Sequence, residues 1–405
     1  MGFIGKGFAG GTIWWLLGVV YAFQTIIIGS LIAPRMRDIE SATTLGGVYG
    51  AKVGSFSQFI VGALSVGLCA GFGAVMLAAG GKLFANFFGW PVWIGVVLTA
   101  VLTTIYTITG GLRASVSTDA FQFVVFTILI PLLLVLIIFK GQFDISKLSI
   151  TASNLNTQFF NNTGQIGFVA LVLSFLIGET MIPPYASRAL GAKDKRKAQK
   201  GFWIAGIFAV IWFLCVVLLG IASRQFIEPN VEGDMVLLNL LHIFPDFMRN
   251  FVGIALLGVI MSSLDSLLNS GGVAFSEDVV AIPFQKNGNN LTDQTRLNYS
   301  RVGILAISII GCIGALYVKG IVDGLLKCYA MWGPAIIPSL FYVLLAKRPS
   351  RFVAISSILT GILIPIAMQL KIFSIELDTI IVGTAFSVSV LVIFSIPSVV
   401  LRRSS

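Results

Sequence analysis

Long apolar runs separated by short polar segments extend along the whole chain. A helix that crosses a bilayer needs about 20 mostly apolar residues. Eleven such helices are predicted, at residues 10–33, 54–83, 91–110, 119–139, 165–187, 201–222, 249–275, 302–319, 322–346, 352–370 and 379–401. None of the runs shows the alternating segments of about ten residues that are typical of transmembrane barrels. The pattern therefore predicts an all-α polytopic membrane protein with a single transmembrane domain over residues 1–405.

One apolar run, Gly253–Asp278, is unusual because it carries many polar residues in its middle, namely Ser262, Ser263, Asp265, Ser266, Asn269 and Ser270. At about 100° per residue, four of them share an arc of about 100° on one helix face. These four are Ser262, Asp265, Ser266 and Asn269. Polar groups at membrane depth are costly unless they face protein, water or an ion. We therefore expect this face to look onto something polar inside a bundle of helices.

Composition and charge agree with a membrane protein. The 405 residues are 57% hydrophobic and only 11% charged, whereas soluble domains carry roughly 25% charged residues. The net charge of +10 does not predict nucleic-acid binding, because 18 of the 27 lysines and arginines lie in one set of alternate loops. The positive-inside rule assigns those loops to the cytoplasm. With eleven spans, this places the N-terminus outside and the C-terminus in the cytoplasm.

Residue types that commonly carry catalysis are scarce. The single histidine, His242, lies in a predicted external loop, which argues against histidine-based chemistry. The four cysteines lie within apolar runs without metal-ligand spacing, so we interpret them as small core residues. No nucleophile–base pair or phosphate loop is recognisable in the sequence. We therefore expect a protein that is not an enzyme.

Glycine and proline interrupt several of the apolar runs. The interruptions are Gly110-Gly111 at the end of the third run, Pro183-Pro184 in the fifth, Gly271-Gly272 late in the seventh, and Gly333-Pro334 with Pro338 in the ninth. An unwound turn at membrane depth frees backbone groups for ligands, so broken helices point to transporter binding sites. Glycine and proline are also generally frequent in membrane helices. Breaks near acidic or aromatic residues are the ones expected to matter.

Several polar residues are candidates for ion binding. The adjacent hydroxyls of Ser262 and Ser263 suit Na⁺, although serines also bond to their own helix or pack against neighbours. Asp265 should protonate or find a cation, as a proton site, as part of a solute pocket, or as the partner of Lys327. Asp119 opens the fourth run, where a helix N-terminus alone would stabilise it.

Other candidates lie near the breaks and face a solute pocket in this interpretation. Glu179 precedes Pro183-Pro184 by four residues and is suited to a cationic solute group, or to a structural pair. Tyr185 and Trp332 offer aromatic surfaces for stacking on a solute, or for packing alone. Asn269, one turn after Asp265, is assigned to the same pocket.

Three blocks of the sequence resemble the sodium:solute symporter family, which includes sodium-coupled proline, pantothenate, sugar, sialate and iodide carriers. The block IYTITGGLRASVSTDAFQ at 105–122 is similar to that family's YT-x-x-GG-(x)-A-x-x-x-TD-x-x-Q loop. The block PPYASRALGAKDKRKAQK at 183–200 is similar to its P-x-x-x-x-R loop. Residues 254–278 resemble its A-x-(M)-S-(ST)-L…(F)-x-(E)-D helix. The blocks occur in the family's order, and the resemblance covers essentially the whole chain.

This resemblance implies a LeuT-type inverted-repeat bundle and Na⁺-coupled alternating access. It places the hydroxyl pair of the sodium site on Ser262 and Ser263, Asp119 near the ion path, and the broken helix at 179–185 along the solute pocket. The family begins with one or two further spans, and carbonyls of an unwound helix there complete its sodium site. Only Gly5–Gly11 resembles the tail of that region, so we expect an N-terminally truncated or degenerate sequence.

The expected function is a symporter of the cell (cytoplasmic) membrane that imports a small organic solute, with Na⁺ as the coupling ion and no other cofactor. Its expected partners are Na⁺, the solute and the lipid bilayer, and not nucleic acid. One alternative is a proton-coupled carrier that uses Asp265 or Glu179, whose uptake would follow pH rather than sodium. A second is a truncated, non-transporting membrane sensor or component.

Overall fold

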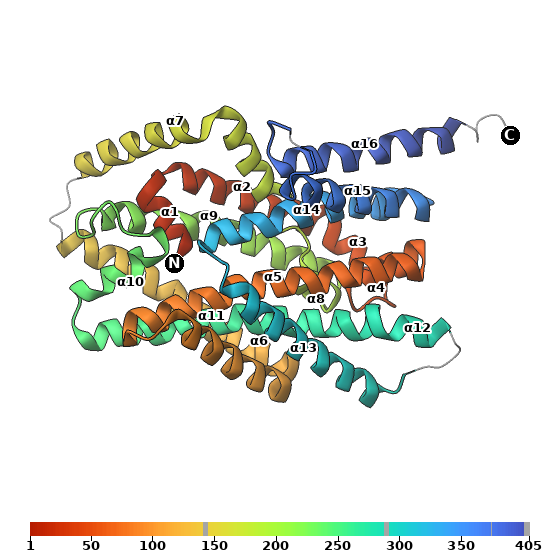
Figure 1. Ribbon diagram of the computed structural model, residues 1–405, viewed down its shortest axis with the longest axis horizontal. Helices are drawn as coiled ribbons and strands as arrows, with labels where there is room; N and C mark the ends of the chain where they lie inside the picture. The colour runs from red at the N-terminus through yellow and green to blue at the C-terminus, as the bar shows by residue number, and fades with distance from the viewer. Residues whose placement is uncertain (141–144, 287–290, 374, 401–405) are drawn as a thin grey trace.

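The computed structural model describes residues 1–140, 145–286, 291–373 and 375–400, without the side chains of 112–114, 116–117, 145–148, 285–286 and 395–400. Within these ranges all regular secondary structure is helical, which confirms the all-α prediction. The long helices run side by side along the long axis of the molecule (Figure 1). The helices of the first half are α1 (Gly2–Gly10), α2 (Ile13–Ile27), α3 (Ala33–Arg37), α4 (Leu45–Val53), α5 (Ser55–Phe88), α6 (Val92–Lys140), α7 (Ile145–Ile177) and α8 (Pro183–Leu190). Those of the second half are α9 (Lys195–Ser223), α10 (Val236–Leu240), α11 (Asp246–Ala274), α12 (Ala281–Lys286), α13 (Asp293–Ala315), α14 (Ile321–Leu345), α15 (Arg351–Gln369) and α16 (Thr379–Val400).

Ten helical segments of the described residues are long and apolar enough to cross a membrane. They are Ile13–Arg37, Ser55–Phe88, Val92–Gly111, Thr118–Lys140, Ser149–Ile177, Lys195–Ser223, Asp246–Phe284, Asp293–Ala315, Ile321–Leu345 and Arg351–Gln369. The eleventh predicted span falls on α16, whose described apolar part, Thr379–Phe394, is shorter. Each predicted span therefore coincides with helical residues. The fifth begins directly after the non-helical Gly164 inside α7, whose φ is 69°, and is divided by the break described next.

Two of the expected helix breaks are present, and one of them is displaced. Helix α6 is interrupted at Gly111, whose φ of 60° suits glycine. The break in the fifth span lies at residues 178–182, before Pro183-Pro184 rather than at them. The two prolines instead begin α8, where a missing backbone N–H leaves no hydrogen bond unmade. Met181, inside the break, has a φ of 49°, which is unusual for a residue with a side chain.

The other two expected breaks are wrong, because α11 and α14 are continuous there. Gly271-Gly272 lies within α11, which continues through a π-helical turn (Phe275–Val280) into α12. A Cβ on Gly271 would lie 2.5 Å from Ile307, so this glycine allows α13 to approach closely. Helix α14 contains Pro334 and Pro338 without a break. The carbonyl of Ile336, between these prolines, accepts hydrogen bonds from the hydroxyls of Tyr49 and Ser339.

The first residues of the chain form a short helix that is packed inside the bundle. Helix α1 lies against α9 at a contact made by glycines. A Cβ on Gly7 would lie 2.6 Å from the carbonyl oxygen of Val217, and one on Gly220 would lie 2.1 Å from that of Ile4. The two backbones therefore approach closely, as small residues permit between membrane helices. Gly11, with a φ of 67°, separates α1 from α2.

Candidate functional site

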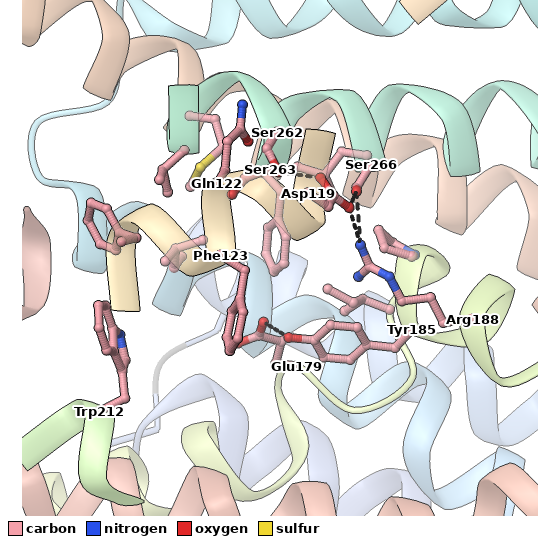
Figure 2. A pocket seen from close by; sticks show the side chains of 18 of the residues that line it. Asp119, Gln122, Phe123, Glu179, Tyr185, Arg188, Trp212, Ser262, Ser263 and Ser266 are labelled. Atoms are coloured by element: carbon pink, nitrogen blue, oxygen red, sulfur yellow. Dashed lines mark hydrogen bonds and ion pairs between the residues drawn. The ribbon is translucent and has the colours of Figure 1, made fainter. Parts of the chain in front are cut away.

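A cavity of about 540 Å³ lies between the helices, lined by residues of α5, α6, α8, α9, α11 and α14 and by Glu179 and Ile182 of the unwound segment 178–182. Figure 2 shows two polar groups of side chains facing this cavity. One group comes from α6 and α11 and contains Asp119, Gln122, Ser262, Ser263 and Ser266. The other contains Glu179 and Tyr185. Aromatic residues line the rest of the wall, including Phe123, Phe126, Phe208 and Trp212.

Asp119 is the centre of the first polar group. The hydroxyl of Ser262 donates a hydrogen bond to its Oδ1. The hydroxyl of Ser266 donates to its Oδ2 at 3.3 Å, and Arg188 Nη2 donates to the same oxygen at 2.9 Å. Ser262 and Ser266 are four residues apart on α11, so both face Asp119. A carboxylate and two hydroxyls from two helices thus meet at the edge of the cavity.

The atoms of this cluster that could bind a cation are all oxygens. Arg188 carries a positive charge itself and cannot be a ligand. Hard cations prefer carboxylate and hydroxyl oxygens to nitrogen or sulfur. Ser263 lines the cavity beside Ser262 and is exposed to it. The three predicted sodium ligands, Ser262, Ser263 and Asp119, therefore lie close to one another, and their donor atoms suit Na⁺.

The unwound segment carries the second polar group. Glu179 accepts hydrogen bonds from the hydroxyls of Tyr185, at 2.7 Å, and Tyr329, at 2.5 Å. Tyr185 is in turn 2.7 Å from the hydroxyl of Tyr21 on α2. Both carboxylate oxygens of Glu179 are therefore engaged by tyrosines from different helices. Glu179 and both of these tyrosines line the main cavity.

Residues from α2 and α14 support the break from behind. Trp332 is buried and donates from Nε1 to the carbonyl oxygen of Thr180 at 2.9 Å. Gln24 Nε2 donates to the Thr180 hydroxyl at 2.5 Å. Trp332 is not among the residues that line the main cavity. The structure thus places this predicted solute-stacking residue behind the unwound segment, where it satisfies a free backbone carbonyl.

Asp265 and Asn269 also lie behind the cavity wall. Asp265 is fully buried, and its Oδ1 accepts hydrogen bonds from Thr107, at 2.9 Å, and from Asn269, at 2.6 Å. Neither Asp265 nor Asn269 lines the main cavity. The alternative that Asp265 pairs with Lys327 is wrong, because Lys327 lines a separate, smaller cavity beside Gly167 and Asp378. Within the predicted polar stripe, only the serines reach the main cavity.

The structure adds Arg188 to the site, although the sequence had indicated only its place in a basic, family-like loop. Arg188 lies on α8, six residues after Ile182, and reaches back to Asp119. The sequence placed Arg188 five residues after Pro183, next to the predicted break, and this was the available signal that it belongs to the site. No spacing in the sequence shows that its helix points toward α6. Gln122 and the aromatic wall were missed because apolar runs do not show which of their residues face a cavity.

Comparisons with known proteins agree with this architecture. The chain matches the sequence model of the sodium:solute symporter family over residues 1–361. It is 25% identical to "Sodium/proline symporter 2" of Staphylococcus saprophyticus over 297 residues, which are 71% of this chain but 58% of that relative. It is 25% identical to the "Osmoregulated proline transporter OpuE" of Bacillus subtilis over 378 residues, which are 89% of this chain and 76% of that relative.

A solved structure has the same fold. It is described as the "substrate-bound outward-open state of a Na+-coupled sialic acid symporter" and superposes with a TM-score of 0.79 at 17% identity. The match covers 96% of this chain and 84% of that chain. The expected LeuT-type helical bundle is confirmed by this similarity. Since the family match extends over most of the sequence, the chain belongs to the sodium:solute symporter family.

Proposed function

We propose that this protein is a secondary transporter that couples the entry of Na⁺ to the import of a small organic solute. The observation that carries the proposal is the Asp119–Ser262–Ser266 cluster at the edge of a cavity that also contains an unwound helical segment. Membership of the sodium:solute symporter family favours Na⁺ over a proton and favours transport over sensing or catalysis.

The proposed sodium ligands are Asp119, Ser262 and Ser263. Asp119 supplies the negative charge, and the serines supply hydroxyl oxygens from successive positions of α11. Ser262 already contacts Asp119, so Na⁺ binding at this point requires rotation of a hydroxyl proton rather than movement of a helix. Further ligands come from water or from the solute in the cavity.

The proposed solute contacts are Glu179 and Tyr185, with the aromatic wall enclosing the apolar part of the solute. The cavity of about 540 Å³ lies in the range typical of small-molecule sites. Two of the relatives are named for proline and the structural neighbour for sialic acid. We propose an amino acid, whose cationic amino group suits Glu179, or a comparably small solute with such a group. Asp265, Asn269 and Trp332 then act by holding α6, α11 and the unwound segment in place.

Coupling follows from the shared cavity. Na⁺ joins α6 to α11, while the solute touches the unwound segment and, through Tyr329, α14. Each ligand stabilises the conformation in which these elements are close together, so each raises the affinity for the other by the same factor. Alternating access then moves the occupied cavity from one face of the membrane to the other.

The proposed location is the cell membrane, with the N-terminus of this chain outside and its C-terminus in the cytoplasm. The support is the basic loop set, which holds 18 of the 27 lysines and arginines. Accessibility of cysteines placed in the loops at Lys193 and Glu232 to an impermeant thiol reagent tests this orientation.

The primary experiment is ²²Na⁺ binding to the purified chain, followed by uptake of labelled proline into proteoliposomes under an imposed Na⁺ gradient. We expect saturable Na⁺ binding that is lost in the Ser262→Ala/Ser263→Ala double variant. A K⁺ gradient of equal size is the control for uptake. Saturable binding that the double variant retains would contradict the proposed site, and uptake indifferent to Na⁺ would contradict the proposed function.

A further inference from the structure

Arg188 lies next to Asp119 and contacts oxygen atoms of the cluster that a bound cation would also contact. Its Nη2 lies 2.9 Å from Asp119 Oδ2 and 3.1 Å from Ser266 Oγ. The same carboxylate oxygen also accepts from Ser266 at 3.3 Å. A positive charge carried by the protein itself therefore already binds the carboxylate that the proposed sodium site uses.

The ion pair between Arg188 and Asp119 is weak enough for a competing cation to displace it. One guanidinium nitrogen is involved, so the pair is not the bidentate arrangement that gives arginine–carboxylate pairs their strength. The Arg188 side chain is 51% exposed and that of Asp119 is 22% exposed. Ion pairs with this much access to water contribute little stability. A competing cation can thus replace the guanidinium at small cost.

The same ion pair lies between two cavities. A second cavity of about 250 Å³ adjoins the main one and is lined by residues that include Ser187, Ala192 and Ser270. Four residues line both cavities, namely Asp119, Pro184, Arg188 and Ser266. Figure 2 shows Arg188 reaching from α8 toward Asp119 and Ser266, which come from the opposite wall. The bridge from Arg188 to Asp119 and Ser266 therefore lies, with Pro184, at the boundary between the two cavities, which we call the partition.

The second cavity extends toward the predicted cytoplasmic side. Its residues Gly191 and Ala192 immediately precede the basic segment Lys193–Lys200. The carbonyl oxygen of Ala192 is bound by Arg37 Nε at 2.6 Å, and Arg37 belongs to another loop of the basic set. An ion that leaves Asp119 through the partition enters a space next to these loops.

The other nearby carboxylate does not offer an equivalent partner. Asp265 is buried and turned toward Thr107 and Asn269. Asp119 is therefore the carboxylate for which Arg188 and a bound cation would compete.

We propose that Arg188 is a tethered cation that exchanges with Na⁺ at Asp119 and closes the partition between the two cavities when it binds. This inference rests on the proposed sodium-coupled function and extends it to the release of the ion. Na⁺ arriving from the main cavity displaces Arg188 from Asp119. The return of Arg188 to Asp119 then expels Na⁺ into the second cavity. Helix α8 carries Arg188 and directly follows the unwound segment. A movement of Arg188 at the ion site is therefore transmitted through α8 to the solute contacts at Glu179 and Tyr185.

The test measures ²²Na⁺ binding to the full chain with Arg188→Gln, Arg188→Lys and the control Arg196→Gln. Arg196 lies in the neighbouring basic segment, and its removal changes the net charge equally without touching Asp119. If Arg188 competes with Na⁺, Arg188→Gln tightens Na⁺ binding by about two- to fivefold, the range that a half-exposed ion pair is worth. Arg188→Lys, which keeps the charge, stays near the parent value, as does Arg196→Gln.

A second readout follows the partition without relying on Na⁺ affinity. In a background whose native cysteines are replaced, an impermeant thiol reagent is added on the external side only, so that it must pass the partition to reach position 187. We then expect alkylation of Ser187→Cys to be accelerated by Na⁺ when Arg188 is present. With Arg188→Gln we expect fast alkylation in the presence and absence of Na⁺. Na⁺ binding that is weakened or unchanged by Arg188→Gln in a folded variant would overturn the exchange. If the parent chain binds no Na⁺, the proposed function fails, and the exchange fails with it. If the parent binds Na⁺ but Arg188→Gln shows no gain in affinity, only the exchange fails.

Discussion

Asp119 and Asp278 are two carboxylates associated with α11, one facing it from α6 and the other in the π-helical turn that continues it. Their surroundings are opposite. Asp119 faces α11 from α6, lines two cavities, and is bound by serine hydroxyls and by a half-exposed arginine. Asp278 lies in the π-helical turn after α11 and is fully buried. It accepts hydrogen bonds from Thr44, at 2.8 Å, and from Gln58, at 2.9 Å.

The two sites also differ in the space that their neighbours leave. Gly46 and Gly62 lie against Asp278, where a Cβ on either would come within 2.5 Å of its side chain. Glycines therefore seal this carboxylate between α4, α5 and the π-helical turn, whereas a cavity is left beside Asp119. A buried acid in a membrane helix is not by itself an ion site. Under the proposed function, access to the carboxylate oxygens is what separates a binding role for Asp119 from a structural role for Asp278.

The largest effect that would sharpen this contrast is expected for Asp119→Asn. Asparagine keeps the shape but removes the charge next to the ion, which is worth about 4 kcal/mol at an effective dielectric constant of about 20. We expect Na⁺ affinity to fall by about 100-fold or more in ²²Na⁺ binding. Asp278→Asn is the matched control and should leave Na⁺ affinity within about twofold of the parent in the protein that folds. An equal loss in both variants would remove the distinction between the two carboxylates.

Substitutions around Asp278 should change folding stability rather than Na⁺ affinity, and the largest such effect is expected at Gly62. Gly62→Ala places a Cβ 2.2 Å from that of Asp278, and overpacking of this kind costs about 1–3 kcal/mol. Gly67→Ala, on the same helix with nothing within 4 Å, should instead stabilise by about 0.5–1 kcal/mol. The free energy of unfolding in a detergent titration measures both. A harmless Gly62→Ala would show that the seal around Asp278 is loose.

A smaller effect is expected from Thr44, which begins α4 and also binds Asp278. Its hydroxyl accepts from the backbone of Gly47 at 2.8 Å and donates to Asp278. Thr44→Val should cost about 1–2 kcal/mol, because it removes the cap and a buried hydrogen bond. Thr292 caps α13 in the same way at an exposed position, so Thr292→Val should cost less. Equal losses in unfolding free energy would mean that the bond to Asp278 contributes nothing.

The smallest effects are expected from single serines at the Asp119 site. Ser262 contacts Asp119, whereas Ser263 lines the cavity beside it. Loss of one neutral ligand is worth about 0.5–1.5 kcal/mol, so Ser262→Ala should weaken Na⁺ binding by about three- to tenfold. Ser263→Ala should weaken it less. If Ser263→Ala has the larger effect, Na⁺ lies further into the cavity than Asp119 allows.

The helix breaks show how far local signals extend. Gly111 ends its helix as predicted, because its backbone conformation is a local property of glycine. Pro334 and Pro338 do not break α14, which is continuous from Ile321 to Leu345, so a proline in the sequence is not sufficient to end a packed helix. Conversely, the turn at 178–182 has no proline of its own and is held open by contacts from Tyr329, Trp332 and Gln24. Proline marked the vicinity of the site but not the position of the break.

The sequence by itself determined the membrane class, the helices, and the polar stripe on the helix that became α11. These properties follow from hydropathy and from a fixed rotation per residue, which act within one segment. Only the tertiary structure decided that Ser262 and Ser266 face Asp119, while Asp265 accepts hydrogen bonds from Thr107 and Asn269. It also brought Arg188 to Asp119 across 69 residues of chain. Such meetings depend on how separate helices pack, and no spacing along a single helix encodes that packing.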